Sequence, residues 1–564
     1  AKTMGWDVKE QEPGQWRRVV PSPDPEFVMH GLSIRTLVEA GTIVIAAGGG
    51  GIPVYSTDEG KLKGIDAVVD KDLSAAKLGR VIRAQEYYII TDIDQVYKNY
   101  NTPDQSPIDQ MTDTEAKQLQ EEGHFQQGSM WPKIRSAIHF LKHHGEKAVI
   151  TNIANIQKAI EGEISPMIPT TYLQHHKNTT LILDEEAAAE LTRIKTPWLV
   201  STCKWDDSNR SKAIVWLCEK TGKSILKLTD EDYNQHGMSD LLALSGSAYD
   251  LNIGMFNRLQ RSITGWPGGK PDADDKYRPE RSKPNSKRVI IFSPHPDDDV
   301  ISMGGTFDRL VSQGHEVHVV YQTSGNIAVS DQDALKYLEV TSDLIQLDAN
   351  SVLDKLRNEF STTNLNQPAA RSVCDLKGSI RKRESLGATR YFAIPDEQVH
   401  FMNLPFYETG MIAKNPISQE DIDLTVAMIE KIKPHQIYAA GDLADPHGTH
   451  KVCLDVVFES MRRLKAAGDA WVKDCWVWLY KGAWQEWDIA DIEMAIPMSP
   501  DQVIKKRFGI FIHQSQKDSV PFQGSDMREF WQRAETRNAN TAQLYAALGQ
   551  TKYAAIEAFV RWHY

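Results

Sequence analysis

The side chains with the clearest chemistry lie in residues 293–299, which read Ser-Pro-His-Pro-Asp-Asp-Asp. His295 and Asp298 are residue types that bind metal ions, and Asp297 stands beside them. The segment directly follows an apolar run at 288–292 that predicts a buried strand. Because open α/β sheets place ligands in loops at the carboxyl ends of their strands, this segment is a candidate half of a metal site.

A second histidine-bearing segment, residues 441–450, follows another predicted strand at 436–440. Asp445 and Pro446 are suited to be the cap and the first residue of a helix, so we expect a helix to begin there. His447 and His450 would then share one helix face, because residues three apart are neighbours on a helix.

Together the two segments can build a hydrolytic zinc centre. A catalytic zinc takes three His or carboxylate ligands and keeps one position open for water, and His295, Asp298 and His450 supply such a set. Zinc lowers the pKa of its water from about 15.7 to about 7, so a nearby carboxylate can take the proton as the water attacks an amide carbon. We expect Asp297 to be this base and His447 to stabilise the oxyanion and assist the leaving amine.

Each segment also has a structural interpretation. A single histidine in a loop is usually structural, and three aspartates before a helix can simply complement its dipole. The two segments follow two strands of the same predicted domain, and this coincidence favours the metal site.

Length and composition place these segments in a multidomain protein. A chain of 564 residues exceeds one ordinary core, and its length allows three or four units. Residues 264–287 are dense in Pro, Gly and charge, as expected of a solvated connector, and we place the main domain boundary there. Apolar runs at 42–54, 67–69, 87–91 and 147–153 before the connector, and at 288–292, 316–321 and 436–440 after it, alternate with helical patterns and predict two α/β domains with mainly parallel sheets.

The motifs after the connector resemble the LmbE-like (PIG-L) family of zinc-dependent N-acetylglucosaminyl deacetylases, whose motifs are His-Pro-Asp-Asp and His-x-x-His. The resemblance covers about 287–564 and implies a Rossmann-like domain with a mainly parallel sheet. It also implies Zn²⁺ bound by His295, Asp298 and His450, Asp297 as general base, and His447 as the oxyanion-stabilising residue.

Other matching features extend this resemblance. Arg381, in an Arg-x-x-Glu pair with Glu384, is implied to contact the substrate. The remaining matches are Gly304-Gly305, Thr323-Ser324-Gly325 and residues 513–516, His-Gln-Ser-Gln. The chain departs from the family at Asp299, where Glu is usual, at Asn326, where an acid is common, and at Asp445-Pro446, where the order is usually reversed. No predicted ligand is lost, but the substrate is left open.

The four glycines at 48–51 follow an apolar run and could bring backbone amides close to a phosphate, although such a run is often only a turn. With the motifs at 70–72, 91–97 and 123–133, residues 1–161 resemble the later half of carbamate kinase, an amino-acid-kinase-like partial α/β domain. The resemblance implies nucleotide contacts, to ADP or ATP with Mg²⁺, from Gly49, Gly50, Lys71, Asp92 and Lys133. The family's early half has no counterpart here, so we expect no kinase turnover and leave nucleotide binding open.

Residues 159–287 resemble the tail of glucosamine-6-phosphate deaminase and its extension in fusions with LmbE-like domains. The deaminase's catalytic motifs have no counterpart, so we interpret His175 and His176 as surface or packing residues. The predicted organisation is therefore a kinase-like half (1–161), a deaminase-like tail and extension (162–263), a linker (264–287) and a deacetylase domain (288–564). A natural fusion and a chimeric or truncated sequence both remain open.

The composition argues against some partners. A net charge of −12 and a pI near 5.8 do not suit binding of nucleic acid through phosphate neutralisation. The five cysteines are widely spaced without a CxxC pair, and no apolar run approaches the roughly 18 residues that span a bilayer. We expect a cytoplasmic protein with a small-molecule partner, no nucleic acid and no membrane, and we leave a homo-oligomer open.

The leading functional prediction is zinc-dependent hydrolysis of the N-acyl amide of an N-acetylglucosamine-like sugar, with or without a phosphate. Two alternatives remain open. One is phosphotransfer between ATP and carbamoyl phosphate, and the other is non-catalytic binding of a nucleotide or a sugar.

Overall fold

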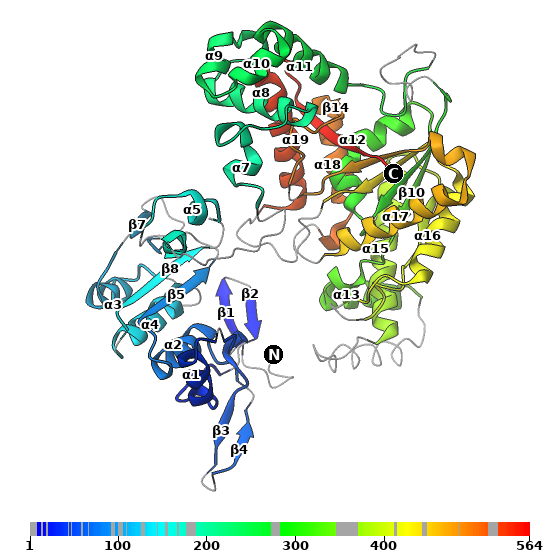
Figure 1. The fold of residues 1–564 in the computed structure, drawn as a ribbon. Helices are drawn as coiled ribbons and strands as arrows, with labels where there is room; N and C mark the ends of the chain where they lie inside the picture. Colours follow the sequence, from blue (N-terminus) through cyan, green and yellow to red (C-terminus); the bar gives the residue numbers. More distant parts are fainter. Residues whose placement is uncertain are drawn as a thin grey trace. The chain divides into compact units, whose positions relative to one another are not determined.

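The computed structural model describes 8–12, 15–18, 21–42, 44–46, 48–57, 60–65, 67–91, 96–99, 105–108, 110–125, 130–143, 145–152, 156–165, 169–175, 188–271, 283–345, 370–410, 414–442, 448–483, 485–516 and 528–564. The chain forms two compact units, Ala1–Thr202 and Cys203–Tyr564 (Figure 1). Among the described residues, no helix combines the length and apolar character needed to cross a membrane. The division of the chain into four segments, 1–161, 162–263, 264–287 and 288–564, remains a prediction.

The first unit is built around two parallel strands, β5 (Glu86–Thr91) and β8 (Lys147–Asn152), and the helices α2 (Lys71–Val81) and α4 (Met130–Leu141). β5 and β8 confirm the strands predicted from the apolar runs at 87–91 and 147–153. The other described helices and strands of this unit are β1 (Val8–Glu12), β2 (Gln15–Arg18), α1 (Gly31–Glu39), β3 (Val54–Ser56), β4 (Leu62–Gly64), β6 (Val96–Lys98), β7 (Ser106–Ile108), α3 (Asp113–Glu121), α5 (Ile156–Glu161) and α7 (Thr192–Lys195).

The strand predicted from the apolar run at 42–54 is wrong, because the described residues of this run form no strand before β3 begins at Val54. An extended segment needs a neighbouring strand for its backbone hydrogen bonds, and β3 pairs only with the short β4 in the described part. Gly49, Gly50 and Gly51 have φ values of 67°, 106° and 87°, which end an extended run. The apolar run at 67–69 also forms no strand.

Within the described part of the second unit, seven strands form one sheet in the order β11-β10-β9-β12-β13-β15-β14. The five neighbouring strands β11, β10, β9, β12 and β13 run parallel to one another. Strand β15 lies antiparallel to both β13 and β14. The sheet is therefore mainly parallel, as expected. Its members are β9 (Arg288–Ser293), β10 (Glu316–Tyr321), β11 (Val399–Phe401), β12 (Gln436–Ala440), β13 (Trp476–Tyr480), β14 (Met494–Met498) and β15 (Ala555–Trp562).

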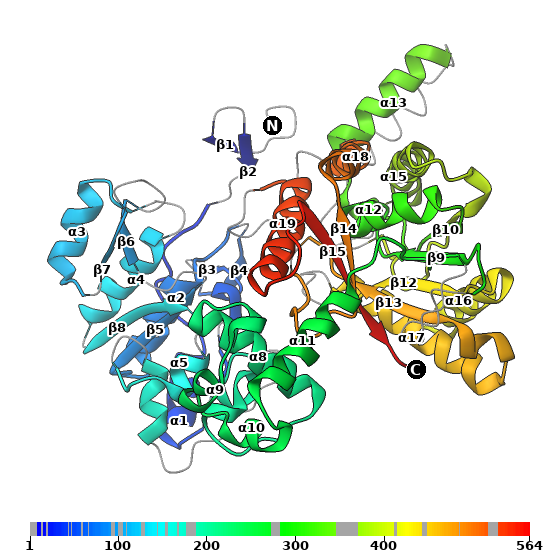
Figure 2. The ribbon, with the colours of Figure 1, turned by 90° about the horizontal axis from the view of Figure 1, so that it is seen from above.

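Alternate residues of β9 supply the cores on the two faces of this sheet. Val289 and Ile291 pack with α12 (Asp298–Ser312), α15 (Arg371–Tyr391), α18 (Pro500–Phe511) and α19 (Phe530–Ala547). Ile290 and Phe292 pack with α16 (Gln419–Ile432) and α17 (Thr449–Ala467) on the other face. Figure 2 shows the strands between these two helical layers. A strand buried on both faces is apolar throughout, which explains why the run at 288–292 predicted β9 well.

Before β9, the second unit carries α8 (Asp207–Thr221), α9 (Asp230–Gln235), α10 (Ser239–Ser245) and α11 (Ala248–Ser262). The end of α11 joins the sheet layer, because Ser262 Oγ and Tyr545 OH are 2.9 Å apart and Ile263 forms a parallel bridge with Ala495 of β14. A further helix, α13 (Asp331–Ile345), follows β10.

Candidate metal centre

The first histidine of the candidate site lies in the short loop between β9 and α12. Asp297 is the N-cap of α12 and Asp298 is its first residue, so both carboxyls stand where the helix dipole favours negative charge. Asp298 Oδ2 accepts a hydrogen bond of 2.8 Å from the backbone N–H of His295. The loop is thereby fixed with the two predicted ligands side by side.

The third predicted ligand, His450, lies in the first turn of α17, after β12. Strand β12 pairs in parallel with β9, so both loops leave the same edge of the sheet. The helix start expected at Asp445 and Pro446 lies outside the described residues, and the described helix α17 begins at Thr449. The preceding Gly448 has a φ of 67°, which the helix cannot continue through.

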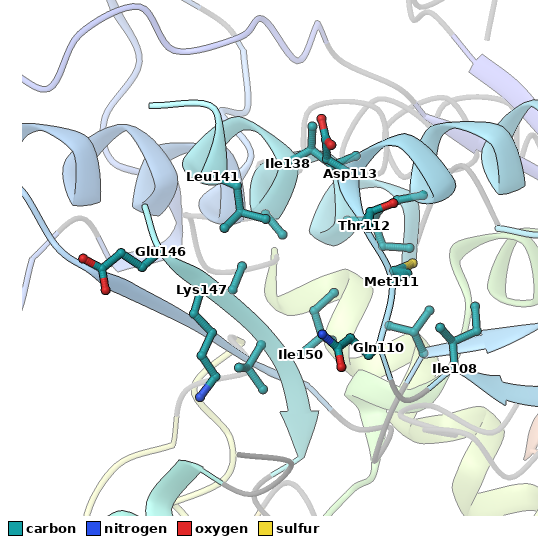
Figure 3. A pocket seen from close by; sticks show the side chains of 16 residues that line it. Ile108, Gln110, Met111, Thr112, Asp113, Ile138, Leu141, Glu146, Lys147 and Ile150 are labelled. Atoms are coloured by element: carbon teal, nitrogen blue, oxygen red, sulfur yellow. The ribbon is translucent and has the colours of Figure 1, made fainter. Parts of the chain in front are cut away.

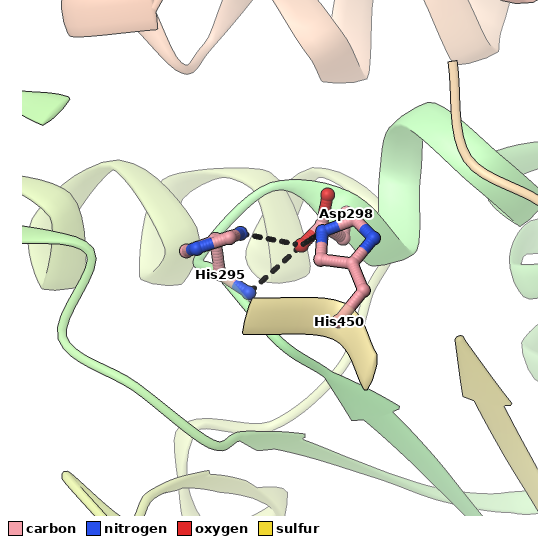
Figure 4. A group of neighbouring side chains, drawn as sticks. All are labelled: His295, Asp298 and His450. Atoms are coloured by element: carbon pink, nitrogen blue, oxygen red, sulfur yellow. Dashed lines mark hydrogen bonds and ion pairs between the residues drawn. The ribbon is translucent and has the colours of Figure 1, made fainter. Parts of the chain in front are cut away.

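These three side chains form one group (Figure 4). Asp298 Oδ2 is 3.1 Å from His295 Nδ1 and 3.1 Å from His450 Nε2, and the two imidazole centroids are 5.3 Å apart. One ligand atom from each residue lies within 4.8 Å of the others. No other such group of three metal-binding side chains occurs in the described part of the chain.

The donor set suits a zinc ion. Tetrahedral zinc with bonds near 2.0–2.2 Å holds neighbouring ligand atoms about 3.3 Å apart, close to the observed nitrogen-to-oxygen distances. Burial alone would raise the pKa of Asp298, but the adjacent imidazoles of His450 and His295 hold it well below its ordinary value. An ionised carboxylate between two histidines is the form a cation needs.

Asp297 is buried beside this group and is held from the opposite side. Its Oδ1 accepts a hydrogen bond of 2.8 Å from Arg381 Nη2, and the Arg381 side chain is only 1% exposed. Burial raises the pKa of Asp297, against the opposing effect of the Arg381 charge. A carboxylate oriented by one hydrogen bond and made more basic by burial has the properties of a general base.

The third aspartate of the motif has a different environment. Asp299 is completely buried, and its carboxylate accepts hydrogen bonds from Ser293 Oγ and from Tyr321 OH, at 3.3 and 3.1 Å. Burial raises the pKa of Asp299 to about 7. Asp299 therefore links the end of β9 to the end of β10 beneath the metal-binding loop, a role that the sequence did not suggest.

The other sequence motifs surround the same loop. Thr323 Oγ1 donates to the carbonyl of Pro294 at 2.7 Å. A Cβ on Gly325 would stand 2.8 Å from Pro296 Cδ, so only glycine fits there, and its φ is 63°. The motifs that resembled the family therefore lie together in space.

The Arg-x-x-Glu pair and the last motif meet on the Asp297 side. Glu384 accepts hydrogen bonds of 2.7 Å from both the N–H and the Oγ of Ser515. The neighbouring His513 is 1% exposed and lines a small cavity with Asp297. Burial lowers the pKa of His513 to about 3, so its imidazole is neutral. The sequence indicated this motif only by resemblance and gave His513 no role.

Two predicted site residues, His447 and Asp92, lie outside the described residues, and their predicted roles remain untested. Arg381, expected at the substrate, is placed against Asp297, at the edge of the candidate centre.

The predicted nucleotide-binding residues of the first unit lie around the start of α2. Gly50 packs against this turn, because its carbonyl accepts a hydrogen bond of 2.9 Å from Ser74 Oγ, and Lys71 is the first residue of α2. Lys133 Nζ lies 3.0 Å from Asp72 Oδ2. Gly49 immediately precedes Gly50. The structure thus brings four of the five residues to one region.

A separate cavity of about 430 Å³ lies elsewhere in this unit, and Figure 3 shows it between β8, α4 and the segment before α3. Its walls are mostly aliphatic, with Ile108, Ile138 and Ile150 among them. None of Gly49, Gly50, Lys71 and Lys133 lines it, so the cavity does not coincide with the predicted nucleotide site.

Comparison with protein families identifies two regions. Residues 290–461 match the PIG-L family, GlcNAc-PI de-N-acetylase, and residues 12–152 match the amino acid kinase family. The chain therefore carries a PIG-L domain after a carbamate kinase-like region, which confirms the two resemblances inferred from the sequence.

Individual relatives extend this result. A putative glucosamine-6-phosphate deaminase-like protein of Bacteroides thetaiotaomicron is 53% identical over 416 residues, 72% of this chain and 63% of that protein. A carbamate kinase of Thermococcus kodakarensis is 44% identical over 168 residues, 30% of this chain and 53% of the kinase. The chain thus spans less than two thirds of either relative, and a fusion architecture with a deaminase-like homologue is supported.

Among solved structures, an N,N'-diacetylchitobiose deacetylase of Pyrococcus horikoshii in complex with an inhibitor is 19% identical, with a TM-score of 0.34 over 51% of this chain and 87% of that protein.

Proposed function

We propose that the second unit is a zinc-dependent hydrolase that removes the acyl group from the nitrogen of an amino sugar of the N-acetylglucosamine type. The observation that carries this proposal is the group of His295, Asp298 and His450 at the carboxyl edge of a parallel sheet. The PIG-L match over 290–461 contains all three residues and supports deacetylation as the reaction type.

In this proposal His295, Asp298 and His450 hold the Zn²⁺ ion. The bound ion supplies a water of low pKa and polarises the amide carbonyl. Asp298 stays ionised between the two imidazoles, so the site keeps a negative charge for the cation.

Asp297 accepts the proton that leaves the attacking water. Its Oδ1 is occupied by the hydrogen bond from Arg381, so we assign the proton to Oδ2. Arg381 positions the carboxylate, and its charge opposes the rise that burial causes in the pKa of Asp297. The proton then passes from Asp297 to the amine nitrogen as the C–N bond breaks.

His447 is assigned from the sequence as the group that stabilises the oxyanion of the tetrahedral intermediate and assists departure of the amine. This assignment rests on the His-x-x-His spacing alone. The acid released is acetate when the substrate carries an acetyl group, and the other product is the free amino sugar.

The test is acetate release by the full chain, loaded with zinc, from a panel of N-acetylated amino sugars. We expect stoichiometric zinc and measurable hydrolysis of at least one member. Asp297→Asn is expected to keep zinc and lose hydrolysis by about 10²-fold or more, whereas His450→Ala is expected to lose zinc as well.

Matched controls are Asp396→Asn, an exposed aspartate, and His563→Ala, an exposed histidine near the end of β15. Both are expected to behave as the unchanged protein. Full activity of Asp297→Asn would refute the base assignment. Absence of both zinc binding and acetate release from every amide would refute the proposed function.

A second candidate function is nucleotide binding by the first unit. It is favoured by the 44% identity to a carbamate kinase and by the placement of Gly50, Lys71 and Lys133 around one helix start. Calorimetric titration with ADP and Mg²⁺ tests it, with Lys133→Ala expected to weaken binding and Lys142→Ala as the control. ATP formation from ADP and carbamoyl phosphate would extend this second candidate function to phosphotransfer. If the titration shows no heat of binding, nucleotide binding by the first unit is refuted.

A further inference from the structure

The small cavity beside Asp297 has room for one group of the substrate. Its volume is about 10 Å³, which admits about one group of the size of a water molecule. Two of its lining residues are Asp297 and His513. The other lining side chains are uncharged and mostly apolar: Ile301, Ile510, Phe511, Gln516, Phe530 and Trp531. A sugar ring is therefore too large for this cavity, whereas a methyl or a hydroxyl fits.

The cavity adjoins the metal-binding loop. Asp297 directly precedes the predicted ligand Asp298, and its carbonyl accepts a hydrogen bond of 3.1 Å from the N–H of Ile301. Burial lowers the pKa of His513 to about 3, the charge of Arg381 lowers it further, and the charge of Asp298 opposes both. The imidazole of His513 is therefore neutral near pH 7 and lies within electrostatic range of a candidate ligand.

His513 brings two hydrogen-bonding atoms to the cavity. Its side chain is 1% exposed, and neither ring nitrogen has a hydrogen-bond partner among the residues that the structure describes. A neutral imidazole has one N–H donor and one acceptor nitrogen, and leaving such groups buried and unpaired is unfavourable. Gln516, by contrast, donates Nε2 to the carbonyls of Ala328 and Ser515, at 3.2 and 2.9 Å. His513 is therefore the polar group that a ligand in this cavity would satisfy.

The position of the proposed base decides which part of the substrate reaches the cavity. Asp297 must lie within hydrogen-bond reach of the attacking water, so the acyl carbon lies close to this carboxylate. That carbon carries the carbonyl oxygen, the nitrogen with its sugar, and the substituent of the acyl group. The carbonyl oxygen belongs at the metal position in the proposed function, and the sugar is too large for the cavity. The acyl substituent is the group that fits, and a hydroxyl on it both donates to and accepts from an imidazole.

We propose that this cavity receives the acyl substituent and that His513 hydrogen-bonds a hydroxyl on it, which makes N-glycolyl amino sugars the preferred substrates. The inference rests on the proposed function and narrows its acyl group. The reaction remains a hydrolysis, in which water adds to the acyl carbon, the C–N bond breaks, and one proton of the water passes through Asp297 to the amine. Glycolic acid and the free amino sugar are released. His513 selects the acyl group and takes no proton.

The kinetic test compares the N-glycolyl and N-propionyl derivatives of glucosamine with the zinc-loaded full chain. The two acyl groups have nearly the same size and differ by a hydroxyl in place of a methyl. We expect kcat/KM for the glycolyl derivative to be about tenfold or more above that for the propionyl derivative, because the methyl leaves His513 unpaired. Equal values for the two derivatives, or a higher value for the propionyl derivative, would overturn the proposal.

Substitutions of His513 test the source of this preference. His513→Leu removes two buried unpaired polar groups, so we expect it to fold and to lower the glycolyl-to-propionyl ratio of kcat/KM to about one. His513→Asn keeps a donor and an acceptor and should retain part of the preference. His563→Leu, at an exposed histidine, is the matched control and should keep the whole ratio. Thermal melts and zinc analysis accompany each variant. An unchanged ratio in His513→Leu would show that the preference does not come from this residue and would overturn the proposal.

A binding experiment separates this inference from the deacetylase proposal. Glycolate and propionate are titrated calorimetrically into the full chain and into its His513→Leu variant, both in the presence of zinc. We expect glycolate to bind about tenfold or more tighter than propionate, and the difference to disappear in the variant. Such a difference without acid release from any amide would support the cavity and refute the hydrolase. Acid release from the amides without such a difference, a difference that persists in His513→Leu, or no binding of either acid would refute the acyl cavity.

Discussion

Arg381 and Asp297 form an ion pair of 2.8 Å in which both side chains are almost completely buried. Because the pair lies directly beside the candidate metal ligands, it ties the orientation of the proposed base to helix α15. Removing the arginine leaves a buried carboxylate without its counter-charge, which favours the protonated form of Asp297 and so removes the base.

For Arg381→Gln we predict that kcat for acetate release falls by about 10²-fold while zinc content is unchanged. The neighbouring Arg383 is exposed on the same helix, so Arg383→Gln serves as the matched control and should keep full activity. Steady-state kinetics and metal analysis on both variants make the comparison. Unaltered kcat in Arg381→Gln would show that Asp297 does not depend on this pair.

A second buried ion pair stabilises the helix that carries Asp298. Lys506 Nζ lies 2.7 Å from Glu557 Oε1, with the side chains 2% and 1% exposed, and Glu557 also accepts from the N–H groups of Gly305 and Thr306. We predict that Lys506→Met lowers the free energy of unfolding by about 3–5 kcal/mol, because it leaves Glu557 buried and unpaired. Chemical denaturation measures this change. Lys505→Met, at the adjacent and partly exposed lysine, should change stability by less than about 1 kcal/mol, and an equal effect of the two would contradict the prediction.

The sequence predicted the central strands of the PIG-L-containing unit well, for a local reason. The runs at 288–292, 316–321 and 436–440 are short, apolar and rich in β-branched residues, and each matches an observed strand within one residue. The candidate metal ligands could be predicted from these strands, because the loops that follow neighbouring parallel strands lie at the same edge of the sheet. The run from 42 failed because its residues have no neighbouring strand in the described part and end in glycines with positive φ.

Other features depend on residues far apart in the chain and left no local signal. Lys506 resembles any lysine of an amphipathic helix until Glu557 is brought against it by the fold. The packing of α11 on α19 joins Ser262 to Tyr545. The start of α17 at Thr449, after Gly448 with a φ of 67°, likewise had no signal in the sequence.

Gly305 and Gly254 are both helical glycines, and they predict opposite effects of the same substitution. A Cβ on Gly305 would stand 2.1 Å from Met498 Sδ, whereas a Cβ on Gly254 would meet nothing within 4 Å. Gly305→Ala should therefore destabilise the protein by about 1–3 kcal/mol, and Gly254→Ala should stabilise it by about 0.5–1 kcal/mol, because alanine favours the helix. Denaturant midpoints of the two variants decide the matter, and a stabilising Gly305→Ala would mean that α12 and β14 pack less closely than described.

His315 predicts how stability changes in mild acid. Burial, and secondarily the charge of Lys287, lower the pKa of His315 from the ordinary 6.5 to about 4 in the folded protein. Between these values the unfolded chain binds more protons than the folded protein, so stability falls as pH falls from 6.5 towards 4. The contribution of this residue is about 3 kcal/mol over that range.

The variant for this measurement is His315→Asn, whose side-chain oxygen can still accept the hydrogen bond that His315 Nδ1 receives from the N–H of Lys287. Other histidines with a lowered pKa, among them His400 and His513, titrate in both proteins, so the informative quantity is the difference between the two stability curves. The unfolding free energy of the variant should fall less steeply than that of the unchanged protein below pH 6.5. Parallel curves from pH 7 to pH 4.5 would mean that His315 is protonated as readily in the folded protein as in the unfolded chain.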